Sequence, residues 1–325
     1  KGIFTYCKNK GNETIPAWCL QSKRIKHDAS KKTIYYDDAV IKVYDFPIFY
    51  FPKLSHPDPT VDRRSGFLTP TLTDSSNVGP GFNIPYFWAI SKDKDLTVSS
   101  KFYTRHNHLL LSEYRQDFEK SFLIVDTSYT DGYKDTSLTK SSGSRAHFFS
   151  KFNMNFFEKN NSSSELEINL QQVSNDTYLK IHDINTTLVN KEISVLENTI
   201  NYDYNDEDLF LGINFSAYDD LTKKGNRKYE YLLPFITFDK NLLVDDKYGT
   251  IDLSSKLQVR NFDVDKQTEM FVNDFIWSSK KFISSLGIEN EFKGLIKGTN
   301  YKASNTNIYK TENSNSELSG ALGAL

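Results

Sequence analysis

Most of this chain alternates between apolar and polar residues, and this period of two constrains the fold more than any other feature. The alternation is persistent from Gly66 onward. Clear segments run over residues 96–102, 151–156, 165–171, 209–216 and 251–260. A β-strand with one dry face and one wet face produces this pattern. The sequence therefore predicts an all-β region built from roughly eleven or twelve such strands.

Two classes of all-β protein share this pattern. A soluble β-sandwich buries the apolar side chains of each alternating strand in a core, whereas a transmembrane barrel presents them to lipid. The strand number and length favour the barrel, as do the Tyr, Phe and Trp residues that recur toward strand ends. We therefore expect an antiparallel meander from residue 66 that places Phe152, Met154 and Phe156 on an outward, lipid-compatible face.

Charge and hydropathy exclude two other classes. The net charge of −2 and the pI near 6.4 provide no basic field, so nucleic acid is not expected as a partner. No stretch approaches the roughly 18 to 20 apolar residues that a membrane-spanning helix needs. The chain begins at Lys1 without a basic and apolar leader, so we expect any signal peptide to have been removed or to lie outside this sequence.

Prolines divide the chain into two regions. Eight of the nine prolines lie at or before Pro85, and only Pro234 follows. The densest run, residues 56–70, contains Pro57, Pro59 and Pro70, and Pro85 interrupts the next strand-like segment. Proline cannot donate a ladder hydrogen bond, so these positions indicate edges, bulges or weakly paired strands.

This division predicts the domain organisation. Residues 1–55 contain short β-rich runs separated by polar turns, which is typical of part of a sandwich or jelly roll. Residues 56–65 are expected to form a linker, and residues 66–325 the alternating region. Arg63 and Arg64 are expected at the rim of that region, near phosphates or acidic groups.

Two cysteines, Cys7 and Cys19, leave two interpretations open. A disulfide between them would close a short loop, stabilise the fold by roughly 2 to 3 kcal/mol and imply an oxidising compartment. Alternatively, they are two unrelated small residues. Two thiols without matching histidines do not predict a zinc site, so no metal or other cofactor is expected.

No catalytic motif is present in the sequence. It lacks a Gly-x-Ser-x-Gly elbow and a phosphate-binding Walker loop. The acidic pairs Glu113 with Asp117 and Asp245 with Asp246 suit solvated charges better than a hydrolase dyad. We therefore do not expect an enzyme.

Several segments of the chain together form a recognisable set of motifs: residues 18–28, 34–39, 47–52, 56–70, 85–90, 95–98 and 113–115. This set resembles one family of outer membrane proteins, the lipopolysaccharide-assembly protein family LptD, also called OstA. The resemblance extends over essentially the whole chain and is strongest for residues 15–120.

The resemblance implies a fold, a location and partners. In that family a periplasmic jelly roll receives lipopolysaccharide from a bridge of similar folds, the LptA-like protein, and passes it to a very large barrel plugged by the lipoprotein LptE. This chain would then hold the last part of the jelly roll and about the first half of an antiparallel transmembrane β-barrel. It would lie in the bacterial outer membrane with its N-terminal part in the periplasm, in contact with outer membrane lipids.

The resemblance also assigns roles to individual residues. Pro70 and Pro85 correspond to the lateral gate. The hinge role expected for Pro57 and Pro59 comes instead from the residues themselves, because both prolines prevent regular ladder pairing where the two regions meet. In the family, cysteines join the jelly roll to a later part of the barrel, so Cys7 and Cys19 pair with each other or with partners outside this sequence. The apolar residues that are candidates for a lipid groove, each of which individually suits an ordinary core position better, are Trp18, Leu20, Ile34, Val40, Ile41, Val43, Phe46 and Ile48.

Two other functions are compatible with the pattern alone. The first is a soluble carbohydrate-binding or hydrolytic β protein, which would need no detergent. The second is a diffusion porin, which would not open laterally.

Overall fold

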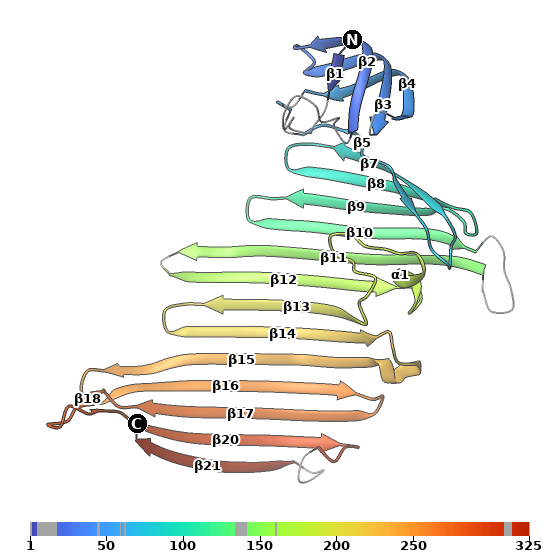
Figure 1. Cartoon of the computed structure of the whole chain (residues 1–325). Helices are drawn as coiled ribbons and strands as arrows, with labels where there is room; N and C mark the ends of the chain where they lie inside the picture. Colours follow the sequence, from blue (N-terminus) through green and yellow to red (C-terminus); the bar gives the residue numbers. More distant parts are fainter. Residues whose placement is uncertain are drawn as a thin grey trace. The chain divides into compact units, whose positions relative to one another are not determined.

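The chain divides into two compact units, residues 1–66 and residues 67–325, in a computed structural model. Figure 1 shows the strands of both units in chain order. The structure describes residues 2–4, 18–43, 46–58, 60–61, 63–133, 142–159, 161–308 and 314–324. Each unit is described by itself below.

The first unit is a four-stranded antiparallel sheet in chain order. Its strands are β1 (Gly2–Phe4), β2 (Trp18–Asp28), β3 (Thr33–Val43) and β4 (Phe46–Pro57). Strand β4 lies at an edge and carries Pro47, Pro52 and Pro57. An edge strand tolerates prolines because one side of its backbone has no ladder to complete.

A local backbone reversal shapes the small core of this sheet. Tyr36 and Ala39 are both almost fully buried, although their odd spacing should place them on opposite faces of β3. Asp38 between them has a left-handed φ of 53°, a conformation that aspartate tolerates better than most residues. The residues of β3 that face the core are therefore even-numbered before Asp38 and odd-numbered after it. A strict period of two could not predict this core.

Removing the Tyr36 hydroxyl is expected to weaken the first unit. The Tyr36 hydroxyl lies 2.6 Å from His56 Nε2, and burial raises the pKa of Tyr36 so that it stays a neutral donor. We expect Tyr36→Phe to lower the free energy of local unfolding by about 1 kcal/mol. Hydrogen exchange of the β3 and β4 amides in the full chain measures this change. The exposed neighbour Tyr35 provides the control, and an equal effect of Tyr35→Phe would contradict the account.

The second unit is dominated by one antiparallel sheet of 15 strands. Two short strands, β5 (Gly66–Phe67) and β6 (Thr71–Thr73), both pair with β7 at one edge, and β21 forms the other edge. The long strands are β7 (Gly81–Ala89), β8 (Lys94–Tyr103), β9 (Leu109–Asp117), β10 (Ser121–Gly132), β11 (Ser142–Lys159), β12 (Ser162–Val173), β13 (Val195–Asn205), β14 (Leu209–Asp220), β15 (Tyr229–Asp245), β16 (Gly249–Phe262), β17 (Lys266–Ser278), β20 (Phe292–Ser304) and β21 (Asn315–Ala324). A hairpin of β18 (Phe282–Ile283) and β19 (Glu289–Asn290) separates β17 from β20.

The predicted all-β fold with a large antiparallel meander is confirmed, since successive long strands pair in chain order. The number of strands is higher than the sequence pattern predicted. Strand β21 was hard to detect because its outward-facing positions include Gly320 and an alanine where large apolar residues would be expected. Strands β5 and β6 are too short to show a period of two.

The sheet has one apolar and one polar face. Phe152 lies between Leu123 and Ile168 in the register, so its side chain shares a face with theirs. Phe156 on this apolar face is exposed, and Phe152 and Met154 are partly exposed, so they do not lie in a closed core. The polar face carries Lys151 and its register partner Asn169.

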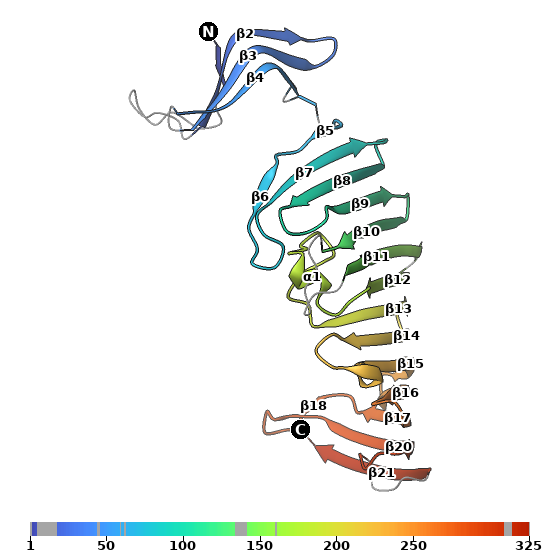
Figure 2. The same ribbon diagram turned by 90° about the vertical axis from the view of Figure 1, so that its right-hand side faces the viewer.

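A short helix covers part of the polar face. It is α1 (Tyr178–Ile181), within residues 174–194, the connection between β12 and β13. Tyr178 and Leu179 pack with Leu109, Leu111 and Phe149 of the sheet. Figure 2 shows α1 on one side of the sheet, and Figure 1 places it near the strand ends.

Turn lengths differ between the two ends of the strands. Short turns at residues 118–120, 206–208 and 246–248 join strands at one end. Longer connections at residues 104–108, 174–194 and 221–228 lie at the other end, which is the right-hand end in Figure 1. Residues 263–265 and 279–291 are exceptions to this rule. Because residues 67–73 lead into the longer connection 74–80, the chain enters the sheet at the end with mostly short turns.

Candidate functional site

The first strand of the sheet is broken at a proline. β5 ends at Phe67 and β6 begins at Thr71, and the intervening residues, which include Pro70, form no strand. Thr71 and Thr73 of β6 pair with Asn83 and Gly81 of β7. We call residues 67–73 together with β7 the seam. A strand with a gap offers its neighbour fewer backbone hydrogen bonds than a continuous one.

Pro85 weakens the same seam from the other side. The Leu68 amide donates to the Pro85 carbonyl oxygen at 2.9 Å. In an antiparallel ladder the N–H and C=O of one residue point toward the same neighbouring strand. The donor that Pro85 lacks therefore faces residues 67–73, while its pairing with Ser99 of β8 needs no bond from Pro85. Both predicted gate residues thus reduce hydrogen bonding at one edge of the sheet.

Large apolar side chains surround this weak ladder. Phe67 and Leu72 are 75% and 83% exposed, and the Phe67 ring contacts Tyr86 edge-on with centroids 5.1 Å apart. Phe82, the register partner of Leu72, is also exposed. The seam therefore presents apolar surface that suits acyl chains rather than water.

Charged and hydrogen-bonding side chains cover the polar face next to the seam. Arg115 contacts both carboxylate oxygens of Asp95, at 2.9 and 3.3 Å, which is the bidentate geometry of a strong ion pair. Farther along the sheet, Lys151 lies 3.0 Å from Glu167. This face is suited to contact with water or sugars.

A polar cavity of about 160 Å³ lies on this face beside the seam. Among the described residues, Asn83 Oδ1 and Asp126 Oδ2 are buried acceptors without a hydrogen-bond partner. Such acceptors favour an occupant that can donate hydrogen bonds, such as water or a hydroxyl group. The cavity is lined by Asn83, Thr97, Ser99, Lys101, Leu111, Ser112, Glu113, Asp126, Asn185 and Thr186.

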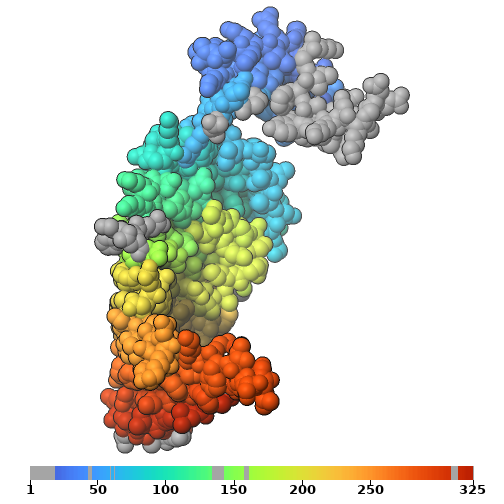
Figure 3. Space-filling view, turned by 90° about the vertical axis from the view of Figure 1, so that its left-hand side faces the viewer, coloured from blue at the N-terminus to red at the C-terminus, as the bar shows by residue number. Residues whose placement is uncertain are grey.

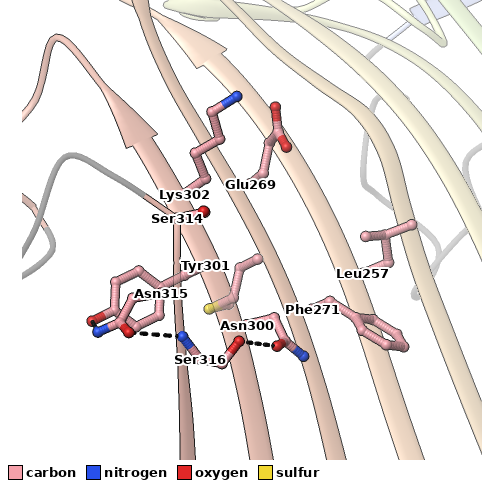
Figure 4. Close-up of a pocket in the computed structure, with 10 residues that line it drawn as sticks. Leu257, Glu269, Phe271, Asn300, Tyr301, Lys302, Ser314, Asn315 and Ser316 are labelled. Carbon is pink, nitrogen blue, oxygen red and sulfur yellow. Dashed lines mark hydrogen bonds between the residues drawn. The ribbon is translucent and has the colours of Figure 1, made fainter.

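The apolar face carries two shallow grooves between its last strands. One, of about 660 Å³, includes Phe275, Trp277 and Ile296 among its lining residues. The other, of about 510 Å³, lies where apolar side chains give way to polar ones (Figure 4). There Leu257 and Phe271 lie near Glu269 and Lys302 (Figure 4). The apolar part of this face therefore ends here, on the side where the strands are joined by the longer connections.

A projecting hairpin was not identified from the sequence. Residues 279–291 extend from the body of the second unit, in orange-red in Figure 3, and expose Ile283 and Leu286. The only sequence signal is a pair of apolar residues in a polar turn, which is too short to show a period.

The groove candidates of the first unit lie in different environments. Leu20, Ile34 and Ile41 belong to the small core, and Val40 is partly buried. Phe46 and Ile48 are exposed on β4, as are Phe49 and Tyr50, which the sequence reasoning missed. The side chains of Trp18 and Val43 lie outside the described residues. The lipid groove therefore stays a prediction.

The linker residues divide between strand and irregular structure. β4 continues through His56 and Pro57, two residues into the expected linker, and Pro57 pairs with Thr33. Pro59 lies outside the described residues. Arg63 is exposed, and Arg64 donates a hydrogen bond to the Thr33 hydroxyl. The proposed hinge and rim roles stay predictions.

Cys19 on β2 is partly buried, and its thiol forms no disulfide with any residue that the structure describes. Cys7 lies outside the described residues, so the pairing of these two cysteines stays a prediction. Within the described ranges, no group of three or more His, Cys, Asp or Glu side chains could hold a metal ion. No helix in the same ranges is long and apolar enough to cross a membrane.

The fold and the seam define the class of this protein: an all-β chain in which a small sheet precedes a large antiparallel sheet with one apolar and one polar face. Its sequence is 29% identical over 181 residues to the LPS-assembly protein LptD of Legionella pneumophila (strain Paris), covering 53% of this chain and 21% of that protein. It is 26% identical over 287 residues to LptD of Pseudomonas aeruginosa (strain LESB58), covering 84% and 28%. LptD of Nitrosococcus oceani is 28% identical over 210 residues, covering 62% and 25%.

The resemblance to LptD proteins is therefore confirmed. The chain spans between about a fifth and somewhat more than a quarter of the length of these relatives. No protein-family model matches the chain.

Proposed function

We propose that the protein containing this chain transports lipopolysaccharide and inserts it into the outer leaflet of the bacterial outer membrane. The observation that carries this proposal is the seam: a broken first strand against Pro85, at the edge of a sheet with an apolar and a polar face. The similarity to proteins named LPS-assembly protein LptD supports it.

The two faces match the two halves of the substrate. Lipopolysaccharide has acyl chains that need a dry path and an anionic sugar head that needs a hydrated one. In the proposed mechanism the sugar head follows the polar face, where Lys101 lines the polar cavity and Arg115 and Lys151 are each paired with a carboxylate of the same face. The acyl chains leave sideways through the seam, where Phe67, Leu72 and other side chains are exposed. No covalent chemistry is needed, so the proposal includes no catalytic residue.

Loop lengths support an orientation. In outer membrane barrels the short turns face the periplasm and the long loops face outward. On this rule the connections 104–108, 174–194 and 221–228 face the exterior, and residue 67 enters from the periplasm. We propose that the N-terminal unit lies in the periplasm and receives the lipid there from an LptA-like bridge. An LptE-like lipoprotein is proposed to plug the interior.

Crosslinking from defined positions tests this proposal. A photoreactive amino acid at Leu72, in the full-length protein in living cells, should form an adduct with lipopolysaccharide. The same amino acid at Phe275 faces the apolar side far along the sheet and is the control. We expect several-fold more adduct at Leu72. Equal adduct at both positions would indicate general contact with membrane lipid and contradict a specific exit, and a gain in permeability to small solutes without adduct would favour a porin.

A further inference from the structure

Residues 174–194, which we call the strap, are fixed to the polar face by an apolar cluster and by hydrogen bonds. Tyr178, Leu179, Ile184 and Val189 of the strap are all nearly fully buried against strands β8, β9, β11 and β13. The Lys101 ammonium and the Tyr103 hydroxyl donate to the backbone oxygens of Asp183 and His182, each at 3.1 Å. The strap also forms one side of the polar cavity, through Asn185 and Thr186.

A buried chain of polar groups continues from the strap into the sheet. The Tyr178 hydroxyl lies 2.6 Å from Ser128 Oγ, which lies 2.5 Å from His147 Nδ1. His147 Nε2 lies 2.7 Å from Asp126 Oδ1. The Asp126 carboxylate therefore faces the His147 ring.

Among the described residues, no carboxylate is hydrogen-bonded to His182. Its side chain is only 1% exposed, and neither ring nitrogen has a hydrogen-bond partner among the residues that the structure describes. The ring centroids of His106 and Tyr178 lie 4.4 and 4.8 Å from that of His182.

The charged groups around His182 oppose a positive charge there. On the sheet side these are Lys101 of β8, Arg145 of β11 and His106 of the connection 104–108. The Tyr103 ring also lies beside His182, and the Tyr133 ring contacts His106. On the strap itself, Asp183 is paired with Lys191 at 2.8 Å. The site therefore accommodates a neutral imidazole and disfavours an imidazolium.

We propose that the strap is a proton-sensitive lid that stays on the polar face while His182 is neutral and lifts when His182 gains a proton. Lifting would open the polar cavity and uncover the sheet beside the seam. His182 accounts for both closure and release, because its imidazole is buried where the strap contacts the polar face and must be neutral to stay there.

The direction of the pH dependence follows from burial. Burial, followed by the positive charges of His106, Arg145 and Lys101, lowers the pKa of His182 to about 3 in the closed strap. An exposed histidine has a pKa of about 6.5, so the lifted strap binds a proton that the closed strap does not bind. Closure is thus fully favoured above about pH 6.5 and loses about tenfold in its equilibrium constant for each pH unit below that value.

Cysteine accessibility in the full-length protein, in outer membrane vesicles, tests the proposal. Val189→Cys places a thiol at a buried strap position, and Thr187→Cys places one at an exposed position nearby. Each variant is labelled with a membrane-impermeant thiosulfonate, and the labelling rate at position 189 is divided by the rate at position 187. This ratio cancels the pH dependence of the reagent. The parent protein is the blank. We expect the closure equilibrium to fall about 100-fold between pH 7.5 and pH 4.5, seen as a rise in this ratio.

Two variants separate His182 from general acid effects. His182→Gln and His182→Phe cannot be protonated, so the ratio should become independent of pH in at least the variant that keeps the strap closed at pH 7.5. His108→Gln, which removes an exposed histidine in the same connection as His106, should keep the response of the parent. A flat ratio in the parent, or the same rise with both His182 variants, would overturn the proposal.

Discussion

Replacing Pro70 and Pro85 with threonine should slow the delivery of lipopolysaccharide to the cell surface about tenfold while leaving the amount of assembled protein unchanged. Threonine at position 85 restores a backbone donor that faces Leu68, whose amide now donates one hydrogen bond to the Pro85 carbonyl oxygen. Threonine at position 70 restores a donor in the gap between β5 and β6, which we expect to allow a more continuous first strand. A backbone hydrogen bond contributes about 0.5 to 1.5 kcal/mol net. Two such bonds make opening harder by about 1 to 3 kcal/mol, and 1.4 kcal/mol corresponds to a factor of ten.

The measurement is the rate at which newly made lipopolysaccharide becomes accessible to a surface enzyme or antibody. Pro80→Ala provides the control, because Pro80 lies in the turn before β7 rather than in a strand of the seam. Unchanged delivery by a fully assembled double variant would show that the prolines do not set the cost of opening.

An arginine on the apolar face should impair membrane assembly severely. Ile296 is 57% exposed and lies between Phe275 and Gly320 in the register, within the apolar stretch of β20. An arginine near the middle of the bilayer costs about 2 to 4 kcal/mol on the lipid face of a barrel. We therefore expect Ile296→Arg to reduce the assembled fraction of full-length protein strongly, as measured by its resistance to unfolding in detergent without heating.

The matched control is Thr299→Arg. Thr299 lies on the same strand but on the polar face, where its register partners are Val272 and Glu317. This substitution should be tolerated because the face is hydrated and a carboxylate is near. If the two variants assembled equally well, the apolar face would not face lipid.

The period of two was enough to predict the large sheet and its two faces. Leu123, Phe152 and Ile168 belong to different strands, yet the register places them side by side on the apolar face, as alternation requires. The prolines were also informative, because the missing donor of Pro70 or Pro85 is a local property. The sequence could not predict that the missing donor of Pro85 points toward Leu68 rather than toward β8, since that depends on the register.

The contacts of the strap could not be predicted either. Lys101 and Asp183, or Ser128 and Tyr178, are far apart in the chain, and no local pattern connects them. In the first unit, the left-handed backbone at Asp38 places both Tyr36 and Ala39 in the core, although strict alternation puts them on opposite faces. Strict alternation therefore assigns one of these two residues to the wrong face. Apolar character alone does not distinguish a groove from a core, and the candidates Leu20, Ile34 and Ile41 lie in the core.

A disulfide across the seam tests the central claim most directly. Leu72 and Phe82 are register partners, so Leu72→Cys with Phe82→Cys can join residues 67–73 to β7. The pair Ser255→Cys with Asn273→Cys joins β16 to β17 away from the seam and is the control under the same oxidation. The account predicts that oxidation of the seam pair stops lipopolysaccharide delivery, that reduction restores it, and that the control pair has no effect. Delivery that continues at the parental rate while the seam disulfide is fully formed would contradict it.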